Sequence, residues 1–224
     1  MKRFFLFISL LIIGSIASSL LAQEKSFLNR ITLEAGGGYN IPVSPDRGDI
    51  STSNFTGLRG FYLATNYELS NTTGLRFTYA NNSFQDKNDS SMGLTHHKFM
   101  AEGTFNVVQW IEMVQNPFEV IAHAGAGISL GKSKLSSDID KMGTLQVGLM
   151  PLFRITNKIS IHADAAYVIN LRQNYFYDGR QATLDGSQTE GEYFIFNLGV
   201  GVRFWVNRNK ELETWDKELE QINW

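Results

Sequence analysis

The sequence contains no cysteine among its 224 residues, which excludes a disulfide framework and thiolate metal sites. An excess of positive charge is also missing, because 20 Lys and Arg residues stand against 22 Asp and Glu, a formal net charge of −2. A mildly acidic chain lacks the basic surface that nucleic-acid binding requires. We therefore expect no nucleic-acid partner, and the residues indicate no cofactor and no metal site.

Long apolar runs are confined to the start of the chain. Beyond residues 1–22 there is no uninterrupted apolar run of the roughly 18 residues that a membrane-spanning helix needs. A chain without such runs can cross a membrane only as a closed barrel of strands, because hydrocarbon offers no partner to free backbone groups.

The first residues have the layout of a secretory signal peptide. Lys2 and Arg3 precede an apolar stretch over residues 4–13, small residues follow, and Ala22 is the expected last residue before cleavage. The alternative, an uncleaved anchor, is disfavoured because the apolar stretch is short, and no cysteine follows that could carry a lipid. Removal of the signal peptide, residues 1–22, takes away two positive charges and leaves a formal charge of −4.

Alternation of apolar and polar residues recurs through the rest of the chain, which is the pattern of β-strands with two different faces. In the sixth segment, for example, Val147 and Leu149 alternate with Gln146 and Gly148. Eight such segments are present, over residues 31–40, 58–69, 75–79, 98–107, 118–130, 145–155, 159–170 and 194–206.

The connections between these segments alternate in length. Long polar connections are expected over residues 42–55, 85–95, 132–142 and 172–190, a medium one over 109–116, and tight turns over 70–73 and 156–158. Long loops on one side and short turns on the other are typical of an outer-membrane barrel. The prediction is an all-β fold: a closed antiparallel up-and-down transmembrane β-barrel of eight strands over residues 23–206, in the outer membrane, with extracellular loops and periplasmic termini.

The polar row of these strands carries charges of both signs. In a soluble barrel this row would face water, but here the apolar rows end in aromatic residues at both sides, which is typical of a lipid-facing exterior. We therefore predict a lumen charge network formed by Glu34, Glu68, Arg76, Lys98, Glu102, Glu119, Arg154, Asp164 and Arg203. Glu68 and Arg76 flank a tight turn and are predicted to form a direct cross-strand ion pair. This pair could instead gate a narrow pore, although a structural role is favoured because buried charges need partners in any case.

Two of the strands carry a family resemblance. Residues 34–39 form a glycine-rich first strand, and residues 197–204 form a last strand that ends in Phe204. With the strand number and the loop lengths, residues 30–206 resemble the small OmpA/OmpX-like outer-membrane barrels. The resemblance implies outer-membrane lipid as the surroundings and an aromatic-ended final strand that the insertion machinery recognises. Members of that family serve as structural anchors, adhesins and parts of envelope machines, and a few are enzymes.

The histidines offer the only candidates for catalysis. His96 and His97 are adjacent, so they point to opposite faces of a strand and cannot hold one metal together. His162 and Asp164 share a face near Ser160, yet lumen-filling residues are the favoured interpretation of this group, and we predict no catalytic residue. The glycine-rich segment over residues 125–131 lacks the spacing and the following helix of a phosphate loop.

Residues 207–224 are expected to form a short amphipathic periplasmic helix whose apolar positions are Leu212, Trp215, Leu219 and Ile222. Docking to a partner and resting on the membrane interface are equally favoured for this helix, and the segment is too short for a peptidoglycan-binding domain. In the fourth long loop, Tyr175, Phe176 and Tyr177 are the predicted contact residues.

The resulting hypothesis is a non-enzymatic outer-membrane barrel with a structural, envelope-stabilising role or a loop-mediated interaction role. It could be an accessory of an envelope machine, with a periplasmic or outer-membrane protein partner. The alternatives are a lipid-modifying enzyme of the deacylase or acyltransferase type and a narrow solute pore.

Overall fold

The computed structural model describes residues 30–45, 51–112, 117–182 and 189–203. The predicted signal peptide over residues 1–22 and the predicted amphipathic tail over residues 207–224, with Leu212, Trp215, Leu219 and Ile222, lie outside the described residues. No helix within the described ranges has the length and the apolar character needed to span a membrane.

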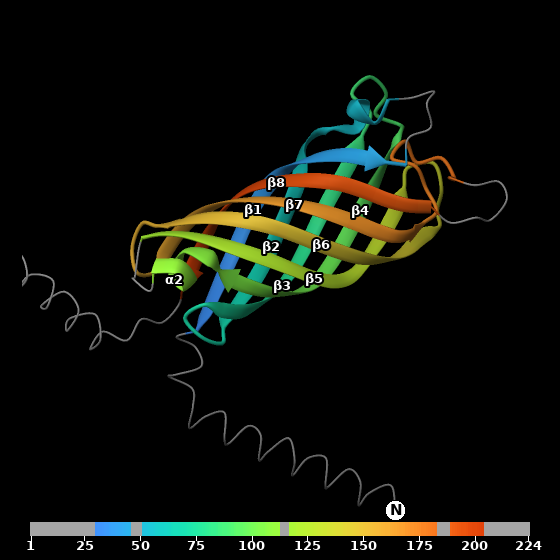
Figure 1. Ribbon diagram of the computed structural model, residues 1–224. Helices are drawn as coiled ribbons and strands as arrows, with labels where there is room; N and C mark the ends of the chain where they lie inside the picture. The colour runs from blue at the N-terminus through green and yellow to red at the C-terminus, as the bar shows by residue number, and fades with distance from the viewer. Residues whose placement is uncertain (1–29, 46–50, 113–116, 183–188, 204–224) are drawn as a thin grey trace, which may run out of the picture.

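Eight strands form one closed antiparallel barrel (Figure 1). Each strand pairs with its neighbour in sequence, and β8 pairs with β1 to close the barrel. Closure leaves no strand edge without a hydrogen-bonding partner, so the predicted fold class is confirmed. The strands are β1 (Ile31–Ser44), β2 (Gly57–Glu68), β3 (Thr73–Gln85), β4 (Gly93–Asn106), β5 (Phe118–Ser133), β6 (Ile139–Arg154), β7 (Ile159–Gln173) and β8 (Thr189–Arg203).

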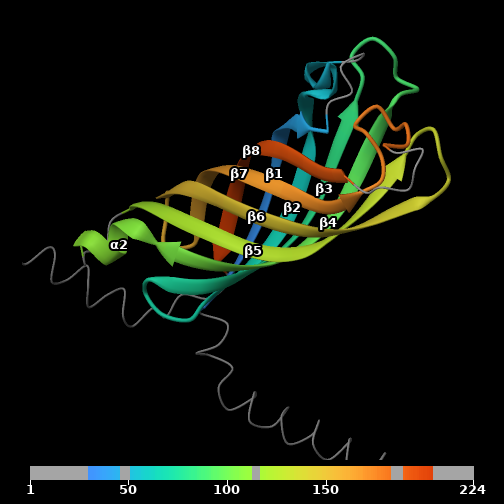
Figure 2. The same cartoon turned by 45° about the vertical axis from the view of Figure 1, so that its right-hand side comes forward.

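The two ends of the barrel differ, as Figures 1 and 2 show. One end holds the β2–β3 and β6–β7 turns and a short helix, α2 (Val107–Glu112), between β4 and β5. The other end holds the remaining connections, including the 3-10 helix η1 (Thr52–Phe55). We call the first the turn end and the second the loop end.

Two connections differ from the prediction. The long loop expected over residues 132–142 is reduced to residues 134–138, because β5 and β6 continue to Ser133 and from Ile139. The polar residues that suggested a loop continue the alternation instead, since Ser133 and Asp140 are buried in the interior. The second difference is α2, which occupies part of the expected 109–116 connection. It starts beside Asn106, whose side-chain oxygen accepts a hydrogen bond from the Gln109 amide at 3.0 Å, an N-cap interaction.

The faces of the strands are inverted relative to those of a soluble protein. Apolar side chains on the exterior are exposed, with Leu198 at 72% and Val147 at 56%, whereas Arg76 and Lys98 in the interior are each 1% exposed. Apolar residues arranged around the outside of a closed barrel match a hydrocarbon environment. The interior is correspondingly polar.

This orientation predicts a depth-dependent response on β6. Val147→Arg places a charge at mid-strand on the exterior and should cost roughly 2–4 kcal/mol of folding free energy in lipid vesicles. Ile139→Arg lies on the same face of the same strand, at the loop end, and should cost only about 0–1 kcal/mol because the side chain reaches the interface. Urea titrations of vesicle-inserted protein would measure both values. Equal costs would contradict a lipid-facing exterior.

Candidate functional site

The interior of the barrel is the region in which the sequence places chemically active side chains. It contains three layers: paired charges at the turn end, an ionic network at the middle, and an aromatic cluster at the loop end. The middle layer holds the most deeply buried charges.

Arg76 on β3 is the centre of the ionic network. Its guanidinium lies 3.0 Å from Glu34 Oε2 on β1 and 3.3 Å from Asp164 Oδ2 on β7. It also lies over the ring of Tyr62, 5.5 Å from the ring centroid, where a cation is attracted to the π face. Asn66 donates a further hydrogen bond to Glu34. A fully buried guanidinium is tolerated only with partners of this kind.

His123 on β5 connects two of the carboxylates. Its Nδ1 lies 2.7 Å from Glu102 Oε1 and its Nε2 lies 3.0 Å from Asp164 Oδ1. An ionised carboxylate only accepts hydrogen bonds, so both ring nitrogens must donate, which is the state of the imidazolium ion. His123 is therefore a cation of the network, like Arg76.

Glu102 and Lys98 on β4 complete the network. Glu102 accepts hydrogen bonds from Thr78 Oγ1 at 3.0 Å and from Gln146 Nε2 at 2.9 Å, and Lys98 donates to the Gln146 side-chain oxygen. The carboxylates of Glu34, Glu102 and Asp164 thus balance the charges of Arg76, Lys98 and His123. This balance explains how six charged groups can share a narrow lumen.

Glycines on the inner face make these long contacts possible. A Cβ at Gly125 would lie 2.8 Å from Glu102 Cγ, and one at Gly148 would lie 2.4 Å from His123 Nε2. Glu102 and His123 therefore lie across the bare backbone of a neighbouring strand, which lets each side chain contact a residue two strands away. An alanine at either position would have to displace the contact.

Glycines on the inner face also allow Tyr62 to lie beside His162. Tyr62 on β2 and His162 on β7 are hydrogen-bonded to each other, although β1 and β8 lie between them. A Cβ at Gly36 would lie 2.6 Å from the Tyr62 ring and a Cβ at Gly199 would lie 2.2 Å from its hydroxyl. The glycine-rich first strand thus provides the room for an aromatic side chain within the lumen.

The predicted Glu68–Arg76 ion pair is wrong. In the β2–β3 hairpin, Glu68 lies opposite Gly74 and Arg76 lies opposite Asn66. The turn is centred one residue earlier than expected, because the Leu69 and Ser70 amides both donate to the Thr73 carbonyl. The side chains keep their predicted inward faces, but each is shifted to another partner.

At the turn end, Glu68 pairs with Arg203 of β8, and Arg154 Nη2 lies 2.6 Å from Glu119 Oε1. These pairs are only partly buried, since 42% of the Glu68 side chain and 35% of the Arg154 side chain are exposed. They surround a cavity of about 100 Å³ that extends inward to Glu34. The structure thus divides the nine predicted charges between the middle network and this cavity.

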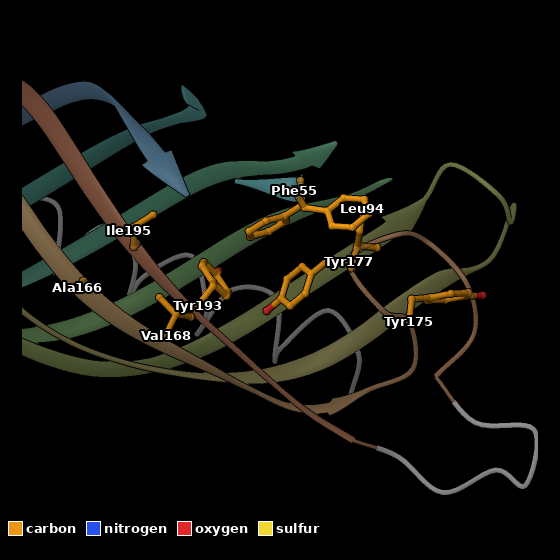
Figure 3. Close-up of a cluster of buried hydrophobic side chains, with 9 residues drawn as sticks. Phe55, Leu94, Ala166, Val168, Tyr175, Tyr177, Tyr193 and Ile195 are labelled. Atoms are coloured by element: carbon orange, nitrogen blue, oxygen red, sulfur yellow. The ribbon is translucent and has the colours of Figure 1, made fainter. Parts of the chain in front are cut away.

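The loop end is closed by a cluster of aromatic and aliphatic side chains, which we call the plug (Figure 3). It consists of Phe55, Phe84, Leu94, Ala166, Val168, Tyr175, Tyr177, Tyr193 and Ile195. Tyr177 enters it from the loop after β7, with its ring centroid 4.6 Å from that of Phe84, and its hydroxyl donates to the Glu192 carbonyl at 2.8 Å.

The plug corrects the prediction that Tyr175, Phe176 and Tyr177 form an exposed contact surface. Tyr175 is 9% exposed and Tyr177 is 1% exposed, so both are taken up in packing, while Phe176 is half-buried. The aromatic rings of Tyr175 and Tyr177 do make apolar contacts, but these contacts are with the barrel of the same chain.

The remaining histidines are also placed by the structure. His96 is buried against Phe84 and Tyr193, whereas His97 lies on the exterior and its Nδ1 is 2.9 Å from the Tyr79 hydroxyl, so the predicted opposite orientation is confirmed. Asp164 binds Arg76 and His123, and His162 binds Tyr62. Within the described ranges, no three His, Asp or Glu residues are grouped so that they could hold a metal ion.

Comparison with solved structures finds a similar fold in proteins of low sequence identity. No protein-family model and no curated protein sequence matches the chain. Neisserial surface protein A is 13% identical with a TM-score of 0.53, over 78% of this chain and 97% of that one. A major outer membrane protein from Thermus thermophilus is 13% identical with a TM-score of 0.50, over 78% and 98%. This chain therefore has the fold of the small eight-stranded outer-membrane barrels.

The corrected pairing predicts which charge matters most for stability. Arg76→Ala leaves Glu34 buried without its cation and Asp164 with only His123, and it should destabilise the barrel by roughly 3–5 kcal/mol. Glu68→Ala disturbs a half-exposed pair and should cost about 1 kcal/mol or less. Unfolding free energies in detergent would separate the two, and a larger effect at Glu68 would contradict the assignment.

A second prediction concerns the protonation of His123. Nitrogen-15 NMR of histidine-labelled protein should show both His123 ring nitrogens carrying protons, because each faces a carboxylate. The His123→Gln variant identifies the signal and serves as the control. A resonance typical of an unprotonated ring nitrogen at His123 would contradict the charge balance of the network.

Proposed function

We propose that this protein is a non-enzymatic barrel of the outer membrane that stabilises the envelope and holds its extracellular loops in fixed positions. The support for membrane placement is the exposed apolar exterior. The observation that carries the structural role is the filled lumen, in which charged and aromatic side chains occupy the space that a channel would need.

The filled lumen disfavours the alternative of a solute pore. A solute entering the cavity at the turn end meets Arg76 with its carboxylates, and beyond it the plug. Within the middle layer the space beside Arg76 and Lys98 amounts to only about 10 Å³, which is about the minimum that holds one water molecule. Passage would require several buried ion pairs to break together, and each break leaves an uncompensated charge.

The loop end supports the second part of the proposal. Residues 174–182 of the loop after β7 are tied to several strands: the Gly93 amide donates to the Asp178 carbonyl at 3.0 Å, and the Asn174 side chain donates to Asp140 at 2.7 Å. Tyr177 anchors the same loop inside the barrel. A loop segment fixed in this way presents a defined surface to a partner, because little conformational entropy is lost on binding.

Two measurements test the proposal. The protein should fractionate with outer membranes and migrate faster on gels when unheated than when boiled, because a folded barrel resists SDS. In planar bilayers it should show no stepwise conductance, in contrast to a wide trimeric porin measured as control. Recovery in a soluble fraction would contradict the membrane placement, and steady ion conductance by the unaltered protein would contradict the structural role.

A further inference from the structure

Three cationic side chains gather on the outer wall of the barrel at the loop end. Lys132, Lys141 and Arg172 lie within three residues of the ends of β5, β6 and β7, which are adjacent strands. All three are exposed, and no side chain of the three forms an ion pair or hydrogen bond with another residue in the described part of the chain. Lys141 lies opposite Leu130, which is two residues from Lys132 on the same face of β5. We call these three residues the basic rim.

Several carboxylates lie near the basic rim. Asp140 is buried and accepts hydrogen bonds from Asn174, and Glu192 on β8 accepts one from Tyr167. Asp138 is the exposed carboxylate nearest in sequence, on the loop between β5 and β6. Glu190 is also exposed, on β8 beside the end of β7. These carboxylates offset part of the charge of the rim, but none of them forms an ion pair with Lys132, Lys141 or Arg172 in the described part of the chain.

The surroundings of the basic rim are apolar as well as charged. Ile139 is 58% exposed and Leu171 is 38% exposed, and both stand beside the cations on the same strands. Cations interspersed with exposed aliphatic side chains fit the headgroup region of a bilayer, where the charge meets phosphate and the aliphatic groups meet the outer ends of the acyl chains.

Below the basic rim, the same wall carries an apolar groove of about 770 Å³. Small residues of β4 and β5, namely Gly103, Ala122 and Ala124, line it together with large ones, which are Phe105, Val147, Leu149, Tyr167, Phe194 and Phe196. A Cβ built on Gly103 would have only the Ala124 carbonyl oxygen near it, at 4.0 Å. The groove is therefore open space on a surface that faces hydrocarbon.

The spacing between the rim and the groove matches one lipid molecule. Lys141 and Val147 are six residues apart on β6, which is roughly 20 Å along the strand. A strand tilt of about 40° reduces this to roughly 15 Å of depth. One leaflet occupies half of a hydrocarbon core of about 30 Å, so an acyl chain attached to a phosphate at the rim would reach the groove.

We propose that this wall is a binding site for an anionic, phosphate-bearing lipid of the outer leaflet. The phosphate contacts Lys132, Lys141 and Arg172, and an acyl chain lies in the groove. The guanidinium of Arg172 suits a phosphate because it can donate two parallel hydrogen bonds. This inference rests on the proposed placement in the outer membrane and adds a preferred lipid class to it.

A second copy of the chain is a less suitable occupant of the groove. A two-fold interface on this wall would bring two copies of the same surface together, and with them two basic rims. The like charges would face each other across the interface and repel one another. A lipid phosphate instead supplies the complementary charge.

Native mass spectrometry of the full barrel in detergent tests the site. The probes are dimyristoyl phosphatidic acid and dimyristoyl phosphatidylcholine, which have the same acyl chains and differ in charge. We expect one phosphatidic acid to be retained in preference to phosphatidylcholine, by roughly ten-fold or more for a cluster of three cations. Combining Lys132→Gln, Lys141→Gln and Arg172→Gln should remove this preference.

The matched control combines Arg59→Gln, Lys87→Gln and Lys158→Gln, which remove the same formal charge elsewhere and should leave the preference intact. For the groove, Gly103→Leu with Ala124→Leu should weaken retention of the same lipid. Ala35→Leu on β1, four strands from β5 in either direction, should not. Equal lipid retention by the rim variant and its control would overturn the proposal, and so would a groove variant that changes only the oligomeric state.

Photolabelling of the unaltered protein provides an independent test of the site. A phosphatidic acid with a photoreactive group in its acyl chain should label residues of β4–β8, and labelling confined to β1–β3 would overturn the site. Heat-dependent gel mobility separates a failure of the lipid site from a failure of the proposed function. A heat-modifiable barrel without lipid preference contradicts only this inference, whereas loss of membrane fractionation contradicts the proposed function.

Discussion

The ladder of hydrogen bonds between β1 and β8 is the interaction on which the rest of the structure depends. Without it, two strand edges would present free backbone groups to hydrocarbon, where they have no alternative partner. Closure also defines an inside, because the inward residues of all eight strands then face a narrow shared space. The inverted placement of charge and apolar side chains follows from this one constraint.

The sequence predicted the fold well because the signal repeats. Each strand shows only a weak alternation, but eight of them with alternating loop lengths agree on one architecture, and the inward faces of Glu68 and Arg76 were predicted correctly. Partners inside the lumen could not be predicted in the same way. They depend on the register at the β2–β3 turn. The centre of that turn lies one residue earlier than predicted, and Arg76 contacts Glu34 and Asp164 instead of Glu68.

Two further features lay beyond sequence reasoning. Tyr175 and Tyr177 belong to a polar loop, and nothing in their local sequence indicates that the loop folds back to close the barrel. The second feature is His123, whose position between Glu102 and Asp164 depends on Gly148, across which it lies. A glycine in a strand is ordinarily a weakness, and its role here becomes visible only with the three-dimensional arrangement.

The middle network has a consequence for how the chain must assemble. Glu34, Arg76, Glu102, His123, Gln146 and Asp164 come from β1, β3, β4, β5, β6 and β7. A partly formed sheet that lacks β7 leaves Arg76 and His123 without Asp164, and one that lacks β1 leaves Arg76 without Glu34. Charge neutrality is therefore reached only near the end of folding, so the last strands to arrive complete the electrostatics as well as the wall.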